Sequence, residues 1–174
     1  GQGVSYCATC DGPLFRGARV AAVGASEEAL EDVHALQSMG CRVLWVPGKG
    51  GGAADSDAAR ALEAKGVEIR REAKVREIRG DQRVEGVRLE GPSGPEDADV
   101  AAVFVFREIP AGPLFERAGL ALDHKQCLAV DRFQRTNIPG VFAAGDITCG
   151  GLQVVAAAGE GCVAAMQALV FLRR

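Results

Sequence analysis

The chemistry that the sequence offers is concentrated in a pair of cysteines near its start. Cys7 and Cys10 are separated by two residues and are followed directly by Asp11. A two-residue spacer lets two cysteines close a small disulfide ring, and a helix start or local positive potential lowers the pKa of the first thiol toward neutrality. We therefore predict that this pair cycles between a disulfide and a dithiol.

Half of a zinc site is the alternative for this spacing. A zinc site needs a second close pair of cysteines or nearby histidines. The sequence offers isolated cysteines at positions 41, 127, 149 and 162, together with His34 and His124. Redox chemistry is therefore favoured, and no metal site is predicted. The four isolated cysteines are expected to be small buried apolar residues.

A second candidate site surrounds Asp146. This aspartate follows a predicted strand, residues 140–144, and then Gly145. That order puts a carboxylate at the carboxyl end of the strand, where it can bind the hydroxyl groups of a sugar or a ribityl chain. Capping of a helix is the alternative role for such an aspartate.

The elements that must position these residues begin with a strand, a glycine and a helix. Residues 19–23 form an apolar strand that ends at Gly24, and a helix is predicted over residues 26–39. A second strand at residues 41–46 completes a right-handed strand–helix–strand unit, which opens a nucleotide-binding type of parallel sheet. The inner face of the helix is expected to consist of Ala29, Leu30, Val33 and Leu36.

The rest of the sequence predicts a mixed structure. Two runs that alternate apolar with charged residues, 75–78 and 84–89, indicate an antiparallel hairpin or meander. The other expected elements are a helix at 55–65, strands at 67–70 and 100–106, a strand-like piece at 127–133 and an alanine-rich terminal helix.

The composition narrows the class of protein. The chain has 174 residues, of which 48% are hydrophobic, and a formal net charge of −3 with both signs interleaved. Such a surface does not select nucleic acid or anionic lipid. The longest apolar runs, such as 100–106 and 154–158, are shorter than a membrane span, and no signal segment opens the sequence. We expect a cytoplasmic protein with no nucleic-acid or membrane partner.

Four segments resemble the low-molecular-weight thioredoxin reductases, in that family's order. Residues 3–12, Gly-Val-Ser-Tyr-Cys-Ala-Thr-Cys-Asp-Gly, resemble the redox-active segment, and residues 136–147, Thr-Asn-Ile-Pro-Gly-Val-Phe-Ala-Ala-Gly-Asp-Ile, resemble the second flavin-binding motif. Residues 20–36 stand at the place of the pyridine-nucleotide turn, and residues 153–165 resemble the helix that meets the flavin ring.

This resemblance implies an α/β fold in two parts. Residues 1–107 would form a nucleotide-binding (Rossmann-like) three-layer domain of the NADPH type with a β-meander. Residues 108–174 would be the C-terminal segment of a second, FAD-binding domain. The family begins with a flavin-binding half that carries its own glycine-rich turn, and nothing like that turn precedes residue 1. The chain is therefore expected to be a fragment of such a protein.

The resemblance also assigns roles at both sites. Cys7 would attack the substrate disulfide, Cys10 would face the flavin, and Asp11 would protonate the departing thiolate. From the residues alone, the role favoured for Asp11 is that of a turn residue before a glycine. FAD would be held by Gly145, Asp146, Ile147, Gln153 and Val154, with the start of the terminal helix directed at the reduced ring.

The nicotinamide site is where the sequence departs from the family. The three positions of the pyrophosphate turn are Gly24, Ser26 and Ala29, whereas a working turn needs glycine at the first two. Glu27 and Glu28 open the helix, where they would repel the phosphates of a dinucleotide.

The segment that should clamp the 2′-phosphate of NADPH is also altered. Where the family has a histidine and arginines, this chain has Lys49 in a glycine run, and one lysine does not replace the bidentate fork of arginine. A later loop, residues 106–110, differs as well. These changes predict impaired NADPH binding and another electron donor, such as ferredoxin, a flavodoxin or a small reductant.

Two functions follow from the sequence. The first is a flavin-dependent disulfide reductase, an enzyme that passes electrons through FAD to the Cys7–Cys10 disulfide and on to a thioredoxin-like protein; the family tendency suggests a homodimer. The second is a non-catalytic fragment or a redox-sensitive binding or regulatory module that keeps the fold.

Overall fold

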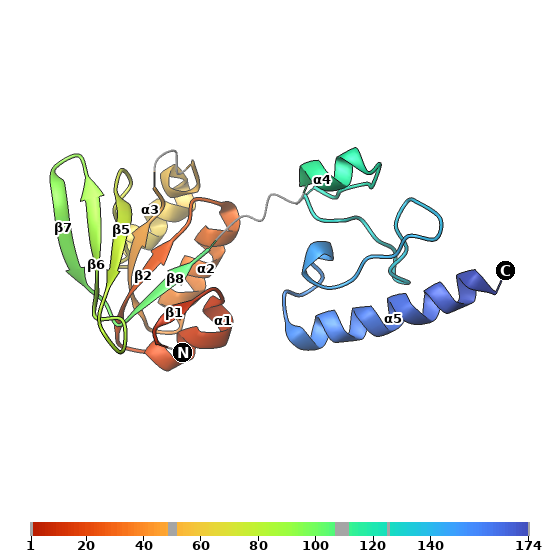
Figure 1. The fold of residues 1–174 in the computed structure, drawn as a ribbon. Coiled ribbons are helices and arrows are strands. Elements are labelled where there is room, and N and C mark those ends of the chain that lie inside the picture. The colour runs from red at the N-terminus through yellow and green to blue at the C-terminus, as the bar shows by residue number, and fades with distance from the viewer. Residues whose placement is uncertain (1, 49–51, 107–111, 125, 174) are drawn as a thin grey trace. The chain divides into compact units, whose positions relative to one another are not determined.

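The computed structural model describes residues 2–48, 52–106, 112–124 and 126–173. The chain divides into two compact units, Gly1–Glu108 and Ile109–Arg174 (Figure 1). The assignment of the units to an NADPH-type and an FAD-type domain stays a prediction.

A parallel sheet of five strands forms the centre of the first unit. The strands lie in the order β1-β8-β2-β3-β4, and each pairs in parallel with its neighbours. Chain order and sheet order differ, so helical connections must cross the face of the sheet between strands. The strands are β1 (Val4–Ser5), β2 (Arg19–Val23), β3 (Arg42–Val46), β4 (Glu68–Ile69) and β8 (Ala102–Val105).

The helices of the first unit begin where side chains cap their free backbone N–H groups. In α2 (Glu27–Ser38) the hydroxyl of Ser26 accepts a hydrogen bond from the N–H of Ala29 at 3.2 Å. The predicted inner face of this helix is confirmed, because Ala29, Leu30, Val33 and Leu36 are all buried. The same unit contains α1 (Ala8–Asp11), α3 (Asp57–Ala64) and the 3-10 turns η1 (Gly12–Phe15) and η2 (Gly52–Asp55).

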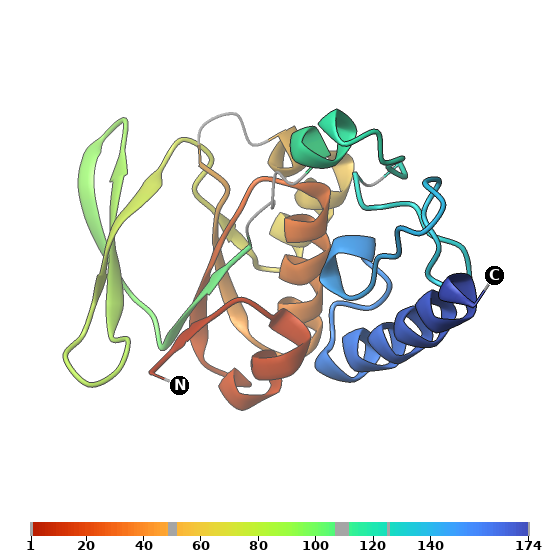
Figure 2. The same cartoon turned by 45° about the vertical axis from the view of Figure 1, so that its right-hand side comes forward.

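An antiparallel meander forms the third layer, with β5 (Lys74–Arg79) paired to β6 (Gly86–Gly91) and β6 to β7 (Gly94–Asp99). The meander lies on the face of the parallel sheet opposite α1 and α2 (Figures 1 and 2). Alternation along the strands supplies both cores. Trp45 and Phe104 belong to the helix-side core, whereas Leu44 and Val103 belong to the meander-side core.

The fold class predicted from the sequence is therefore confirmed for the first unit: an α/β structure with a parallel sheet between helices and a meander. Sequence reasoning missed two strands, β1 and β7. Strand β7 carries Gly, Pro and three acidic residues among its six positions, and these residue types are depleted in strands. Its pairing with β6 overrides that local preference.

The second unit has little sheet structure in its described residues. The predicted strand at 140–144 is wrong, because Phe142 makes an isolated bridge to Arg135, and the piece at 127–133 has an isolated bridge between Leu122 and Leu128. An apolar run becomes a strand when neighbouring strands continue its ladder. The helical elements are α4 (Gly112–Arg117), the 3-10 turn η3 (Asp146–Thr148) and α5 (Val154–Leu172).

Helix α5 is long and apolar enough to cross a membrane when judged by length and composition alone. A search for uninterrupted apolar runs overlooks it, because glycines and Glu160 interrupt the sequence. One such helix is weak evidence for a membrane protein, and none of its apolar window is buried in the structure.

Candidate active site

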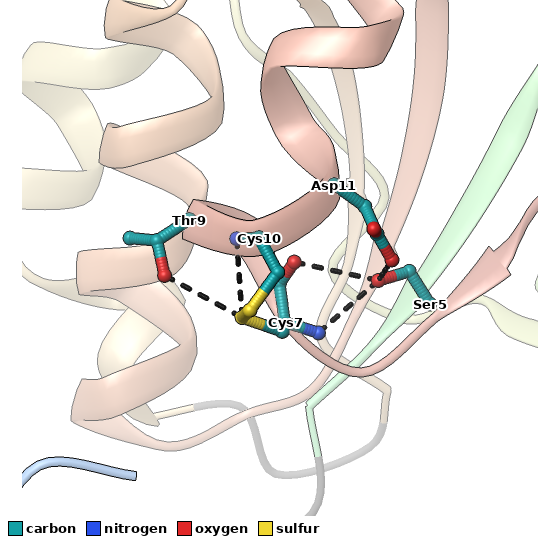
Figure 3. Close-up of a disulfide and its surroundings, with 5 residues drawn as sticks. All are labelled: Ser5, Cys7, Thr9, Cys10 and Asp11. Atoms are coloured by element: carbon teal, nitrogen blue, oxygen red, sulfur yellow. Dashed lines mark hydrogen bonds between the residues drawn. A yellow bond between two sulfur atoms is a disulfide. The ribbon is translucent and has the colours of Figure 1, made fainter. Parts of the chain in front are cut away.

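Cys7 and Cys10 form a disulfide at the start of α1, with their Cα atoms 5.3 Å apart (Figure 3). Cys7 is the N-cap of this helix, and its Sγ accepts a hydrogen bond from the backbone N–H of Cys10 at 3.1 Å. The hydroxyl of Thr9 lies 3.4 Å from the same sulfur. These two donors would stabilise a thiolate on Cys7 once the pair is reduced.

Ser5 fixes the aspartate of this segment. Its hydroxyl donates to Oδ2 of Asp11 at 2.6 Å and accepts from the N–H of Cys7 at 3.2 Å (Figure 3). Ser5 is 5% exposed and lies at the end of β1, opposite Phe104 of β8. The parallel sheet therefore sets the position of the carboxylate relative to the cysteine pair.

Sequence reasoning named Asp11 but missed Ser5. The available signal was weak: a small polar residue follows an apolar one just before the cysteine pair, which also describes an ordinary turn. The hydrogen bond to Asp11 is significant because Ser5 is buried, and a buried hydroxyl needs a hydrogen-bond partner.

The predicted pyrophosphate turn follows β2. At Gly24 φ is +154°, and a Cβ there would lie 2.7 Å from the carbonyl oxygen of Phe106, so the position requires glycine. Trp45 donates its indole N–H to the Gly24 carbonyl at 2.8 Å. Gly24 also lines a cavity of about 470 Å³ at the carboxyl ends of β2, β3 and β8, the edge where parallel sheets bind ligands.

Two acidic side chains lie close to this turn in the sequence. The Ser26 hydroxyl is used as the cap of α2 through the N–H of Ala29, and Glu27 and Glu28 are exposed in the first turn of that helix. Two carboxylates at a helix start occupy the end where an anion would bind. Lys49 and residues 107–110 of the altered loop at 106–110 lie outside the described residues.

The Asp146 turn is held from α5. Glu160 accepts hydrogen bonds from the N–H of Gly145 at 2.7 Å and from the hydroxyl of Thr148 at 2.9 Å. Gly145 has φ +82°, a conformation that glycine adopts without strain. Asp146 itself is exposed in η3. Sequence reasoning missed Glu160, because a single acid in an alanine-rich helix reads as a solvent-facing residue.

These residues fit the chemistry of a flavin. Asp146 offers an exposed carboxylate that can accept hydrogen bonds from hydroxyl groups. Gln153 is the N-cap of α5, and Val154 beside it is 86% exposed, so the first turn offers an apolar surface at the positive end of a 19-residue helix. Ile147, partly exposed in η3, adds further apolar area.

The other four cysteines correct the sequence interpretation. Cys41 is buried and free as expected, and burial raises the pKa of its thiol. Cys162 is exposed, and Cys127 forms a disulfide with Cys149. The sequence could not show this second pair, because its members are 22 residues apart and meet through a turn. Among the described residues, no group of three or more His, Cys, Asp or Glu could hold a metal ion.

Comparison with known proteins agrees with this geometry. Residues 1–161 match the family of pyridine nucleotide-disulphide oxidoreductases. The chain belongs to this family.

Individual relatives narrow the resemblance. The thioredoxin reductase of Aquifex aeolicus is 33% identical over 99% of this chain, which spans 55% of that protein. The structure of the thioredoxin reductase of Streptococcus pyogenes superposes with a TM-score of 0.81 at 29% identity, covering 99% of this chain and 58% of that one. A ferredoxin-flavin thioredoxin reductase of Clostridium acetobutylicum gives a TM-score of 0.52 at 33% identity, covering 99% and 55%.

Proposed function

We propose that the chain is the disulfide-exchanging part of a flavin-dependent disulfide reductase of the thioredoxin reductase type. The observation that carries the proposal is the Cys7–Cys10 disulfide at the start of α1, with Asp11 held beside it by Ser5. Its relatives support this assignment by their names. The chain spans 55% of the Aquifex aeolicus protein and 58% of the Streptococcus pyogenes chain, so the activity of the whole protein belongs to the proposal.

The exchange reaction follows from the positions of three residues. The thiolate of reduced Cys7 attacks one sulfur of the partner's disulfide, and Asp11 supplies the proton that the departing partner thiolate takes. Cys10 gives up its proton and its thiolate then attacks Cys7, which closes the Cys7–Cys10 disulfide and releases the second partner sulfur as a thiolate that takes up a proton. Two electrons and two protons pass to the partner, and the dithiol becomes a disulfide.

FAD would be held by Gly145, Asp146, Ile147, Gln153 and Val154. When bound, it supplies the two electrons that reduce the Cys7–Cys10 pair. The chain's own contribution is to accept ribityl hydroxyls at Asp146, to cover the ring with the exposed first turn of α5, and to favour negative charge there through the helix dipole.

The partner we propose is a thioredoxin-like protein. Exposed apolar side chains flank the cysteine pair, with Tyr6 69% and Leu14 78% exposed, and such groups suit the docking of a protein rather than a small disulfide. We also propose a cytoplasmic enzyme that acts as a homodimer. A cytoplasmic setting would keep the partner's thiols reduced after exchange.

NADPH would be a poor electron donor for this protein. Glu27 and Glu28 at the start of α2 and the engaged hydroxyl of Ser26 support weak binding of its phosphates. We propose another donor, such as ferredoxin. The Clostridium acetobutylicum structure is named for ferredoxin and flavin, and its likeness to this chain supports that choice.

Anaerobic titration of the FAD-loaded protein with NADPH tests the donor. We expect little bleaching of the flavin at micromolar NADPH, whereas dithionite bleaches it completely. Replacing both acids, Glu27→Gln with Glu28→Gln, is expected to increase the NADPH-dependent rate severalfold, because the repulsion is removed. Glu31→Gln, an exposed acid one turn further along α2, is the control. Rapid stoichiometric reduction of the unaltered protein at micromolar NADPH would rule out the proposed change of donor.

A further inference from the structure

The second disulfide closes a loop around the Asp146 turn. Cys127 and Cys149 are 22 residues apart in sequence, with Cα atoms 5.9 Å apart. Residues 136–147, which include Gly145 and Asp146, lie entirely within the loop that this bond closes. The bond therefore constrains the segment to which we assign flavin binding. Neither the proposed exchange at Cys7 nor the proposed flavin contacts use this second disulfide.

The Cys127 end of the bond is well anchored. Cys127 is 6% exposed, and its backbone exchanges two hydrogen bonds with Asp123: its N–H donates to the carboxylate at 3.0 Å, and its carbonyl accepts from the Asp123 N–H at 2.8 Å. The next residue, Leu128, donates its N–H to the carbonyl of Ile147 at 2.8 Å. Cys127 thus belongs to the framework against which η3 rests.

The Cys149 end is exposed and conformationally demanding. Cys149 follows η3 directly and has φ +55°, and Leu152 has φ +50°; both lie in the left-handed region that favours glycine. The residues between them, Gly150 and Gly151, are glycines. Without the bond to Cys127, nothing in the cysteine itself favours this backbone conformation, so the segment after Asp146 would relax.

We propose that Cys127 and Cys149 form a second thiol–disulfide exchange site, whose oxidation state sets the rigidity of the Asp146 turn. The effect on flavin affinity rests on the function proposed above, whereas the exchange and the loosening of the turn do not.

The reductant is a thiol. Its thiolate attacks Sγ of Cys149, the exposed residue of the pair, the bond to Cys127 breaks, and Cys127 leaves as a thiolate that takes up a proton. A second thiolate then displaces Cys149, which is also protonated. Two electrons and two protons enter the protein, and two thiol molecules become one disulfide.

Exposure explains why this bond is reducible from solvent. The attacking thiolate must approach one sulfur, and Cys149 is an exposed residue whereas Cys127 is buried. In the reduced state the turn keeps the Glu160 contacts and the Leu128–Ile147 hydrogen bond but loses its covalent tether. The turn would then open more often, because fewer contacts oppose local unfolding.

Thiol trapping combined with hydrogen exchange tests the proposal. The variant Cys7→Ser with Cys10→Ser leaves one disulfide to follow. Alkylation in glutathione buffers and peptide mapping should show residues 127 and 149 cross-linked when oxidised and both alkylated when reduced. Amide exchange in residues 143–149 should rise at least tenfold on reduction. Cys149→Ser should exchange at the faster rate in both buffers, and Cys162→Ser, which alters the exposed free cysteine of α5, should behave like its parent.

Two results would overturn the proposal: no peptide joining residues 127 and 149 under oxidising buffer, or equal exchange in residues 143–149 in the two states. The dissociation constant of FAD, measured on the same samples, separates the two proposals. A tenfold weaker affinity on reduction agrees with both. The protein could instead bind no FAD in either state while glutathione still reduces the Cys127–Cys149 disulfide and loosens the turn. That result would contradict the proposed flavin function but would agree with the proposed exchange site.

Discussion

At the scale of single residues, the Ser5–Asp11 hydrogen bond fixes the orientation of the carboxylate beside the cysteine pair. A hydroxyl that is 5% exposed donates to the carboxylate at 2.6 Å and accepts from the N–H of Cys7. Asp11 therefore has one preferred orientation beside the cysteine pair. A proton donor that is held in place needs less reorganisation during exchange than one that rotates freely.

We expect Ser5→Ala to slow reduction of a protein disulfide by about tenfold, a fraction of the effect of a positioned general acid. The reason is that Asp11 loses the donor that orients it. Stopped-flow measurement of exchange against pH checks this, because the alkaline limb of the profile, where a general acid loses its proton, should move while the thiol content stays unchanged. The same variant should lose about 1–3 kcal/mol of unfolding free energy.

Thr9→Val is the control for Ser5→Ala. It removes one of the two hydrogen-bond donors to the Cys7 sulfur but leaves Ser5 and Asp11 in place, so it should slow exchange without moving the alkaline limb. If both variants moved the alkaline limb equally, the positioning role of Ser5 would be refuted.

The cysteine pair and the partner of its aspartate differ in how far sequence alone could reveal them. The spacing of Cys7 and Cys10 was enough to predict their disulfide, because a bond between cysteines three positions apart depends only on local geometry. The role of Ser5 depends on β1 being seated against β8, and β1 is two residues long. No pattern of that length predicts a strand.

At the scale of elements, α2 has an amphipathic pattern that predicts its buried face, and it also carries several acidic side chains. Its buried face was predicted residue by residue, because four apolar side chains recur at helical spacing. Asp32 on this helix is half-buried. Burial, followed by the neighbouring charges of Glu31 and Glu28, raises the pKa of its carboxyl.

A raised pKa in the folded state makes ionised Asp32 unfavourable to stability. The contribution of protonated Asp32 to the free energy of unfolding is greatest below the ordinary pKa of aspartate, and it is lost as the pH rises through the raised pKa. Asp32→Asn should therefore stabilise the protein at pH 7 by up to about 1 kcal/mol, since solvent screens a half-exposed group. Urea unfolding at a series of pH values should show this gain disappearing below about pH 4.

Glu27→Gln tests whether the effect belongs to Asp32. This residue is exposed in the first turn of α2, where a negative charge is favourable, so its neutralisation should lower stability at pH 7. A loss of stability for Asp32→Asn, or equal gains for the two variants, would contradict the account of the helix.

Elements that depend on distant partners were the ones that sequence could not supply. The acidic β7 is a strand because β6 pairs with it, and residues 140–144 lack a ladder despite their apolar run. The disulfide between Cys127 and Cys149 likewise depends on two segments that are 22 residues apart in sequence. Local periodicity predicts helices and buried strands well, and it is silent on which segments meet.

At the scale of the whole molecule, the chain joins two units with different chemical equipment. The first holds the exchangeable disulfide on the rim of an α/β sheet, and the second holds an exposed carboxylate turn and an apolar helix. The function proposed above assigns disulfide exchange to the first unit and flavin binding to the second. The proposed change of electron donor rests on the acidic residues at the start of α2, Glu27 and Glu28, and not on any change at the cysteine pair.

Trapping of a mixed disulfide tests the central claim, exchange at Cys7, most directly. The reduced Cys10→Ser variant is mixed with an excess of oxidised thioredoxin, and the products are mapped by mass spectrometry. The account predicts a stable thioredoxin adduct on Cys7 and its absence when Cys7→Ser replaces Cys10→Ser. No adduct on Cys7, or equal adduct on exposed Cys162 in both variants, would contradict it and favour a non-catalytic, redox-sensitive module.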